Sequence, residues 1–454
     1  MGKESANSDL PLGVTQSEKE TRPTNGAESG EESRDKESEV AKQIELFVKQ
    51  TDSLAHTLPT TMLLINAFLE GATKKRKEFI DSCESIPGGP PTKIRIPTDR
   101  HQDFVKCDTD YYRAALASQS VPRSFLVSLI SQFDAYVGGL TRAFLYVVPE
   151  LLSASERVLT FKELNEFSSM VEAREYIVEK EVESLLRKSH AEQFEWMENK
   201  FKIKLRVELN SWATFIEVTE RRNLFVHCDG VVSRQYLRNC KEHGVPSISD
   251  VVIGKRLQVN KKYFETAANC VLEIGVKLGS VLWRKLNPSE RRVADDQLNS
   301  ICFRLIGEGN YELAKNLLDF ASVTLKTHTS DEARRVFVVN RAQTYKWLGD
   351  LAGTKSILDS EDWSACDDKF KIAVAVLRDE YSQAAKLMRI IGPDGSVKKA
   401  FYRSWPLFKE FRKTSDCRTT FEKVFGEPLE TNEADITTKP EMDGGPSEFS
   451  SKPN

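Results

Sequence analysis

Between residues 40 and 430, apolar side chains recur mainly every three or four positions, which is the spacing of amphipathic α helices. After Pro122 this spacing continues through Phe125, Leu129 and Phe133, and it predicts one long helix with a buried face. Alternation with period two is confined to short stretches, of which residues 202–207 are the best example. The sequence therefore predicts an all-α fold. Further helices are expected over residues 161–188, 190–203, 208–229 and 259–285.

The remaining segments suggest how the chain is organised. Residues 40–83 predict a pair of N-terminal helices, separated by a break near Leu58-Pro59. The polar stretch 84–99, which contains Pro and Gly, is typical of a linker ahead of a helical domain over 100–285. Residues 1–39 and 431–454 contain few large apolar residues. Burial cannot offset the entropy of ordering them, so both tails are predicted to be disordered.

A loose repeat marks residues 289–430. Similar segments begin at Gly309, Gly349 and Asp379, each with a turn pair, small residues and an apolar pair. The starts lie 40 and 30 residues apart, on either side of the period of about 34 residues of tetratricopeptide hairpins. The region therefore resembles degenerate tetratricopeptide repeats, which would form a second helical domain. An ordinary helical bundle gives similar spacing and stays open as an alternative.

Charge is distributed unevenly along the 454 residues, whose formal net charge is -3. Both tails are acidic, because residues 1–39 carry five Lys/Arg against ten Asp/Glu and residues 431–454 carry two against five. The body between the tails therefore has an excess of five basic residues. Such a body is compatible with an anionic partner such as nucleic acid, without requiring one.

Three features of the sequence favour a cytoplasmic protein without membrane contact. The first ten residues, MGKESANSDL, lack the apolar core of a signal peptide. The longest apolar stretch, residues 62–69, is too short to span a bilayer. The eight cysteines are scattered singly without a CxxC pair, as in proteins whose thiols stay reduced.

The segment 212–230 carries the candidate chemistry. On a helical wheel Asn223 and His227 share one face, and Arg222 lies at the edge of that face. Arg221 points the opposite way. An Arg and an Asn on the apolar side of a helix need partners, since burying a guanidinium alone is very costly. The pattern therefore predicts a pocket or an interface at this face.

Two interpretations of these side chains stay open. Gly230 is a helix-stop signal, so His227 is expected in the last turn. In the functional interpretation, the guanidinium of Arg222 binds a phosphodiester, and the imidazole of His227 moves protons during attack on it. In the structural interpretation, His227 stabilises the helix dipole and Arg222 pairs with Glu220 or Asp229.

Residues 221–227 (RRNLFVH), followed by residues 228–237 (CDGVVSRQYL), resemble the signature of the HEPN superfamily. That signature is an Arg with a polar residue directly after it, then a His after four to six residues. Arg222, Asn223 and His227 match it with four residues between the Arg and the His. The layout is similar to the RiboL-PSP-HEPN variants, and the resemblance covers about residues 100–285. It implies an all-α HEPN-like domain there.

Many HEPN domains are metal-independent endoribonucleases that act as dimers with a shared cleft. The resemblance implies that Arg222 would bind the scissile phosphate and stabilise charge, while Asn223 would orient the site. His227 would be the general base or acid for attack by the ribose 2′-hydroxyl. The products would be a 2′,3′-cyclic phosphate and a 5′-hydroxyl end, and DNA would not be cut. Such domains often belong to defence or toxin systems.

The partners expected are RNA, a second copy bound through the HEPN-like domain, and a protein held by the C-terminal repeats. No cofactor and no metal are expected. His227, Cys228, Cys240 and His243 make a poor zinc set, because adjacent His and Cys side chains point about 100° apart on a helix. Other HEPN domains keep the fold without catalysis. A non-catalytic scaffold for dimerisation and protein interaction is therefore the alternative function.

Overall fold

The structure, a computed structural model, describes residues 38–86, 94–153, 159–207 and 209–429. These residues form seventeen α helices, joined by turns, short 3₁₀ or π segments and one two-stranded hairpin. The all-α prediction is therefore confirmed. The predicted disordered tails, 1–39 and 431–454, lie outside the described residues except for residues 38 and 39. The chain divides into two compact units, and each is described by itself.

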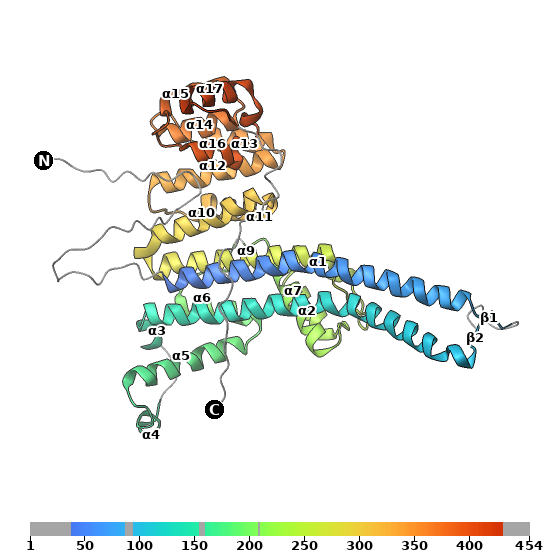
Figure 1. The fold of residues 1–454 in the computed structure, drawn as a ribbon. Coiled ribbons are helices and arrows are strands. Elements are labelled where there is room, and N and C mark those ends of the chain that lie inside the picture. The colour runs from blue at the N-terminus through green and yellow to red at the C-terminus, as the bar shows by residue number, and fades with distance from the viewer. Residues whose placement is uncertain (1–37, 87–93, 154–158, 208, 430–454) are drawn as a thin grey trace, which may run out of the picture. The chain divides into compact units, whose positions relative to one another are not determined.

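The larger unit contains the described residues from 38 to 301 together with 319–333. Its two strands, β1 (Glu84–Ser85) and β2 (Ile94–Arg95), form an antiparallel hairpin. Short 3₁₀ helices cover Thr98–Arg100, Pro246–Asp250 and Pro288–Glu290, and a π turn covers Phe320–Thr324. The α helices are α1 (Glu39–Asp81), α2 (His101–Val147), α3 (Glu150–Ser153), α4 (Phe161–Leu164), α5 (Met170–Leu186), α6 (His190–Phe201), α7 (Trp212–His227), α8 (Arg234–Glu242), α9 (Lys261–Leu286) and the first part of α10 (Arg291–Gly307) (Figure 1).

Helix α9 packs against α1 and α2 at the centre of this unit. Phe47 of α1 lies over Gly275, where an added Cβ would come within 2.2 Å of the Phe47 ring. Tyr136 of α2 stacks on Phe47 with 4.3 Å between ring centroids, and its hydroxyl donates a 2.9 Å hydrogen bond to the Gly275 carbonyl. At Gly279 an added Cβ would come within 2.9 Å of Ile44. The two glycines therefore let three helices interlock at close range.

Two prolines lie inside helices. α1 continues through Pro59 as one helix, where the sequence predicted a break between two. α2 begins at His101 and contains Pro122, where the sequence predicted a helix start. A proline removes one backbone donor and disfavours a helix interior. Leu58 and Pro122 are nevertheless buried, and α1 packs along α2, so tertiary packing offsets a local cost that sequence rules treat as decisive.

Of residues 84–99, predicted as a linker, the structure describes 84–86 and 94–99, which contain the β1–β2 hairpin between α1 and α2 within one unit. Residues 40–83 accordingly pack with 100–285, whereas the sequence suggested a boundary between them. The physical reason is that Ile44, Phe47 and Val48 on α1 are buried in the packing described above. Their apolar face needs a partner surface, and α9 supplies one that is more than two hundred residues away in the sequence.

The shorter elements differ from the predictions in detail. The helix expected over 161–188 is divided into α4 and α5, and the one expected over 208–229 is the shorter α7. α8 was not predicted, and residues 202–207 contain no strand. Serine caps explain two of the starts, because Ser189 and Ser233 each accept a backbone hydrogen bond at the first turn of α6 and α8.

The smaller unit contains residues 302–318 and the described residues from 334 to 429. Its core includes the buried aromatic side chains of Tyr402, Trp405, Phe408 and Phe411. The helices are the rest of α10, α11 (Tyr311–Asp319), α12 (Asp331–Trp347, of which residues 334–347 belong here), α13 (Leu351–Asp359), α14 (Asp368–Leu377), α15 (Tyr381–Ile391), α16 (Lys399–Ser404), α17 (Ser415–Phe425) and the 3₁₀ helices Pro406–Phe408 and Phe411–Lys413.

Three consecutive helix pairs, α10–α11, α12–α13 and α14–α15, are joined by turns of the same construction. The turn residues Gly309, Gly349 and Asp379 have positive φ angles of 80°, 82° and 60°. In each turn the next residue donates a backbone hydrogen bond to the carbonyl five residues earlier. These positions are the starts of the loose sequence repeat, so the repeat corresponds to helical hairpin turns. Its identity as a tetratricopeptide repeat stays a prediction.

Candidate functional site

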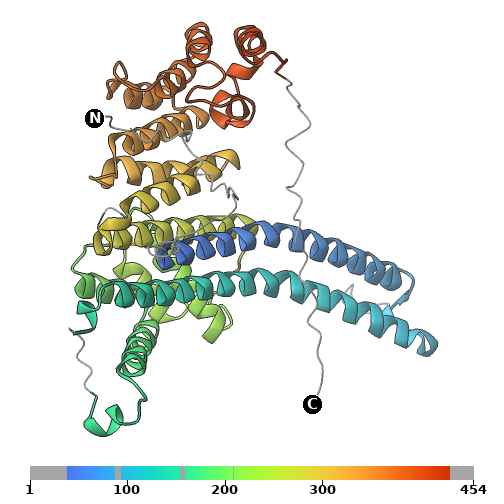
Figure 2. The same cartoon turned by 60° about the vertical axis from the view of Figure 1, so that its left-hand side comes forward.

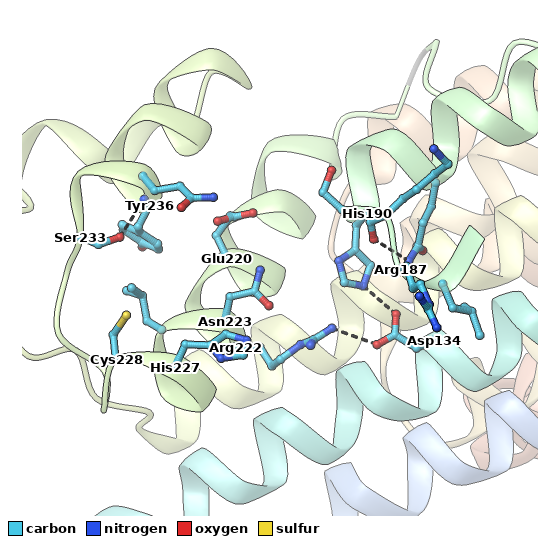
Figure 3. Close-up of a pocket in the computed structure, with 16 residues that line it drawn as sticks. Asp134, Arg187, His190, Glu220, Arg222, Asn223, His227, Cys228, Ser233 and Tyr236 are labelled. Atoms are coloured by element: carbon cyan, nitrogen blue, oxygen red, sulfur yellow. Dashed lines mark hydrogen bonds and ion pairs between the residues drawn. The ribbon is translucent and has the colours of Figure 1, made fainter. Parts of the chain in front are cut away.

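A cavity of about 420 Å³ opens in the larger unit between α7 and the first turns of α6 and α8. Arg222, Asn223 and His227, the three residues selected from the sequence, all line it. Figure 3 shows that the lining side chains of α7 follow one another along the helix, with α2 and α6 on one side and α8 on the other. The structure thus brings the three predicted residues to one open space.

The local structure of α7 explains this placement. The helix ends at His227, and Gly230 follows with a φ of 78°, so His227 lies in the last turn as its sequence position predicted. An added Cβ at Gly230 would come within 2.9 Å of Phe225, which favours glycine there. The Leu257 N–H donates a 2.9 Å hydrogen bond to the Gly230 carbonyl, which fixes the chain after the helix.

Arg221 and Arg222 are neighbours in sequence but face different environments. The Nε of Arg221 donates a 2.7 Å hydrogen bond to Glu217, and its guanidinium lies 3.9 Å from the centroid of the Tyr263 ring. Glu217 also accepts hydrogen bonds from the hydroxyls of Tyr236 and Tyr263. This buried network joins α7 to α8 and α9. Burial alone would lower the pKa of the Arg221 guanidinium, but the electrostatic interactions with Tyr263 and Glu217 outweigh it and raise the pKa. Of these two neighbours, Arg222 lines the cavity and Arg221 does not.

Arg222 is held by a carboxylate that the sequence did not single out. One Nη of Arg222 lies 2.9 Å from a carboxylate oxygen of Asp134 in α2, and the other oxygen of Asp134 lies 3.0 Å from Nε2 of His190 in α6. The His190 ring is buried between Phe133 and Phe215. Asp134 therefore anchors one end of the guanidinium and links it to a packed imidazole.

This pairing corrects the structural interpretation, which named Glu220 or Asp229 as the partner of Arg222. Asp229 instead contacts Arg123 at 3.2 Å and Arg256 at 2.6 Å, beyond the end of α7. The Nε of Arg222 is buried and has no hydrogen-bond partner among the described residues. The guanidinium is thus oriented by Asp134 but not saturated by it.

Asp134 and His190 are the residues that sequence reasoning missed. No recognised motif surrounds His190 in the sequence. One available signal was the carboxylate of Asp134 beside Phe133 in a helix with a mostly apolar face. The contacts themselves join residues 56 and 88 positions apart, which periodicity does not address.

His227 is the exposed member of the site. Its ring has no hydrogen-bond partner among the described residues, in contrast to His190. It lies in the last turn, at the C-terminal end of α7. An imidazole with this freedom can exchange protons with a bound molecule.

Glu220 also lines the cavity and lies two turns before His227 on the same face of α7. Partial burial raises the pKa of its carboxyl, while a hydrogen bond from Asn239 and the nearby charges of His190, His243 and Arg222 oppose that rise. The cavity therefore combines a partly buried carboxyl group, an exposed imidazole and an oriented guanidinium.

The rim of the cavity favours anions. Arg187 and Lys188 line it directly before α6, and Gln235 lines it in the first turn of α8. The capping residues Ser189 and Ser233 place the first turns of two helices at the cavity, and backbone N–H groups there carry partial positive charge. This arrangement supplies hydrogen-bond donors from two directions.

Of the four residues weighed as a zinc set, only His227 and Cys228 line the cavity. Burial raises the pKa of the Cys240 thiol to about 12, so this thiol is a poor source of the thiolate that zinc requires. Among the residues that the structure describes, no group of three or more His, Cys, Asp or Glu side chains is arranged to hold a metal ion. Over the same residues, no helix is long and apolar enough to cross a membrane.

Comparisons with known proteins give no match, since no family model, no curated protein and no solved structure is significantly similar to the chain. The geometry of the cavity is therefore the basis for assigning a function.

Proposed function

We propose that the protein is a metal-independent endoribonuclease that uses Arg222, Asn223 and His227. The observation that supports this proposal is the lining of one open cavity by all three side chains, with the imidazole of His227 unpartnered among the described residues. Cleavage of a phosphodiester needs a cationic hydrogen-bond donor that stays charged and a group that accepts a proton near neutral pH. Arg222 and His227 are groups of these kinds.

In the proposed reaction, RNA enters the cavity with its scissile phosphate at Arg222. His227 accepts the proton of the ribose 2′-hydroxyl, and the resulting oxygen attacks phosphorus. The bond from phosphorus to the 5′-oxygen breaks, which leaves a 2′,3′-cyclic phosphate. Arg222 stabilises the charge that develops on the phosphate oxygens, and the amide of Asn223 orients them.

The departing 5′-oxygen needs a proton. We assign this donation to Glu220, because partial burial raises the pKa of its carboxyl and so keeps more of it protonated. Glu220 and His227 are separated by seven residues on one helical face, or about 10 Å along the axis. A phosphate near Arg222 and Asn223 would lie between these two proton-transfer groups.

The predicted homodimer and a protein partner on the helical hairpins of the smaller unit belong to the same proposal. In a HEPN-type dimer, the cavities of two copies would share one RNA cleft. The repeat turns at Gly309, Gly349 and Asp379 support a hairpin array, and such arrays commonly bind protein on an extended surface.

The competing function is a non-catalytic scaffold. It is favoured by one observation, the ion pair of Arg222 with Asp134, which is what a purely structural arginine would make. Under this alternative the cavity would bind no RNA, and replacing Arg222 would change stability alone.

One assay separates the two functions. The full chain is incubated with mixed RNA in EDTA, beside His227→Ala and Arg222→Ala. We expect cleavage by the parent and a loss of about 10²- to 10⁴-fold in His227→Ala, because acid–base groups contribute on that order. His56→Ala and Arg292→Ala replace an exposed histidine and an exposed arginine elsewhere, and they should cleave like the parent. The proposal is contradicted if the parent leaves RNA intact, or if His227→Ala cleaves RNA as fast as the parent.

A further inference from the structure

The distal halves of α1 and α2, residues 59–81 and 101–121, form an arm that extends beyond α9 (Figures 1 and 2). Nearer α9, each helix has many buried residues. In the arm, only Ala72 and Ala114 are buried. The arm is therefore a two-layer element whose outward faces lack the third helix that covers the rest of the pair.

One outward face of the arm carries an apolar groove. Leu64 and Phe68, one helical turn apart, are 68% and 57% exposed. The groove continues past Phe68 with a volume of about 350 Å³, and Ala67, Gly71 and Cys107 are among the residues that line it. Exposed large side chains beside a groove of small residues are typical of a contact surface.

Gly71 is a second feature of the groove that is typical of a contact surface. It lies inside α1, where glycine lowers helix stability relative to alanine. Its φ is not in the left-handed region, and an added Cβ would meet no atom within 4 Å. Neither backbone geometry nor packing within the described chain therefore requires a glycine here. Close approach by a second backbone would require one.

The charges of the arm indicate what approaches it. The arm contains six Lys/Arg and six Asp/Glu, so it lacks the excess of positive charge that nucleic acid attracts. Even within the basic run 74–77, Arg76 is engaged, with Nε 2.7 Å from Asp108 and the guanidinium 4.8 Å from the centroid of the Tyr111 ring. A surface with balanced charge suits a protein partner.

The rim of the groove is complementary to itself. It carries Lys75 on α1 and Asp103, Lys106 and Asp110 on α2. Because α1 and α2 run antiparallel, Lys75 and Asp103 lie toward the tip of the arm, while Phe68 and Asp110 lie nearer its base. Each end of the groove therefore has a fixed set of charges.

We propose that the groove is a homodimer contact, in which the arms of two copies pack around a two-fold axis parallel to the arm. This symmetry lays α1 of one copy on α2 of the other. Lys75 then faces Asp103 of the second copy, and the reciprocal pair forms by symmetry. The four helices make an antiparallel bundle in which Leu64 and Phe68 are covered. An end-for-end arrangement is disfavoured, because it sets Asp103 against Asp110 of the second copy.

The groove and the cavity have no lining residue in common, so this dimer does not depend on the proposed nuclease activity. The first test is the mass of the full chain, measured by sedimentation equilibrium over a range of concentrations. We expect a dimer, and we expect Phe68→Glu to raise its dissociation constant at least about tenfold, as for a central apolar contact. Leu116→Glu is the matched control, because Leu116 is 68% exposed but does not line the groove.

A charge exchange tests the symmetry itself. Lys75→Asp and Asp103→Lys should each weaken the dimer, and the double variant should restore it, which a folding defect would not do. A parent that stays monomeric overturns the proposal, as does a dimer that Phe68→Glu leaves unchanged. A double variant no better than either single variant also overturns it. The proposal is also overturned if nucleic acid co-purifies with the full chain and is lost in Phe68→Glu.

Discussion

The two halves of the α1–α2 pair have the same helical spacing of apolar residues but opposite surroundings. Near α9, Phe47, Phe133 and Tyr136 are buried and in contact with one another. In the arm, Leu64 and Phe68 are exposed. Periodicity therefore states which residues share a face, and a third layer of structure decides whether that face becomes core or surface.

Charged side chains differ between the same two halves. Asp134, in the covered half, contacts both Arg222 and His190 and so positions a candidate site. Asp103, in the arm, lines an open groove. In the covered half, packed neighbours hold the side chain of Asp134 in a defined position. In the arm, the side chain of Asp103 would be held only by a bound partner.

Replacing one phenylalanine in each half of α1 should give the largest difference. Phe47→Ala removes a buried ring from between α2 and α9 and is expected to lower the free energy of unfolding by about 3–5 kcal/mol. Phe68→Ala should change it by no more than about 0.5 kcal/mol, because the side chain is largely exposed. Urea unfolding measures both, at a protein concentration at which sedimentation shows the monomer. Equal losses would contradict the comparison.

An intermediate effect is expected at Asp134. Asp134→Asn removes the charge that Arg222 and His190 share, and it should lower the free energy of unfolding by about 1–3 kcal/mol. RNA cleavage should fall as well, because the guanidinium loses its orientation. Glu70→Gln, on the exposed surface of the arm, is the control and should leave both unchanged. Cleavage at the parental rate by Asp134→Asn would show that Arg222 needs no positioning.

The smallest effect is expected from the ionisation of Glu220. Burial raises the pKa of its carboxyl, so the folded state binds that proton more tightly than the unfolded state. The resulting stabilisation is present below the unfolded pKa and is lost as pH rises through the folded pKa. Glu220→Gln cannot ionise, so its melting temperature should gain on the parent's as pH rises from the unfolded pKa of a glutamate through the raised folded pKa.

Glu70→Gln, on the exposed surface of the arm, is the control for this pH series. If the difference in melting temperature between Glu220→Gln and the parent is the same at every pH, the Glu220 carboxyl is not buried in the cavity as the structure shows. In the cleavage assay, the same variant should cleave more slowly than the parent and should lose the alkaline limb, at which the parent's proton donor becomes deprotonated.

The site was predictable to the extent that it lies on one helix. Arg222, Asn223 and His227 are within six residues, so helical geometry alone placed them together and placed Arg221 elsewhere. Asp134 and His190 were not predictable, because they come from α2 and α6 and reach Arg222 only through the packing of Phe133 and Phe215. Long-range contacts of this kind leave little trace in a local pattern.

The same limit explains the helix boundaries. The sequence predicted that one helix ends near Pro59 and that another begins at Pro122, because a proline disfavours a helix interior. Both helices continue through these prolines, since burial between α1 and α2 outweighs one lost hydrogen bond. At Gly309 and Gly349 the local signal was sufficient, because a positive φ depends on the residue itself.

By itself, the sequence determined the helical class, the turns of the hairpin repeat and the face of α7 that carries an arginine, an asparagine and a histidine. These features depend on spacing and on local backbone preference. Only the tertiary structure decided that α1 belongs with α9, that Asp134 orients Arg222, and that the arm has an uncovered groove. Those outcomes depend on which surfaces meet, and surfaces meet through contacts between residues far apart in the chain.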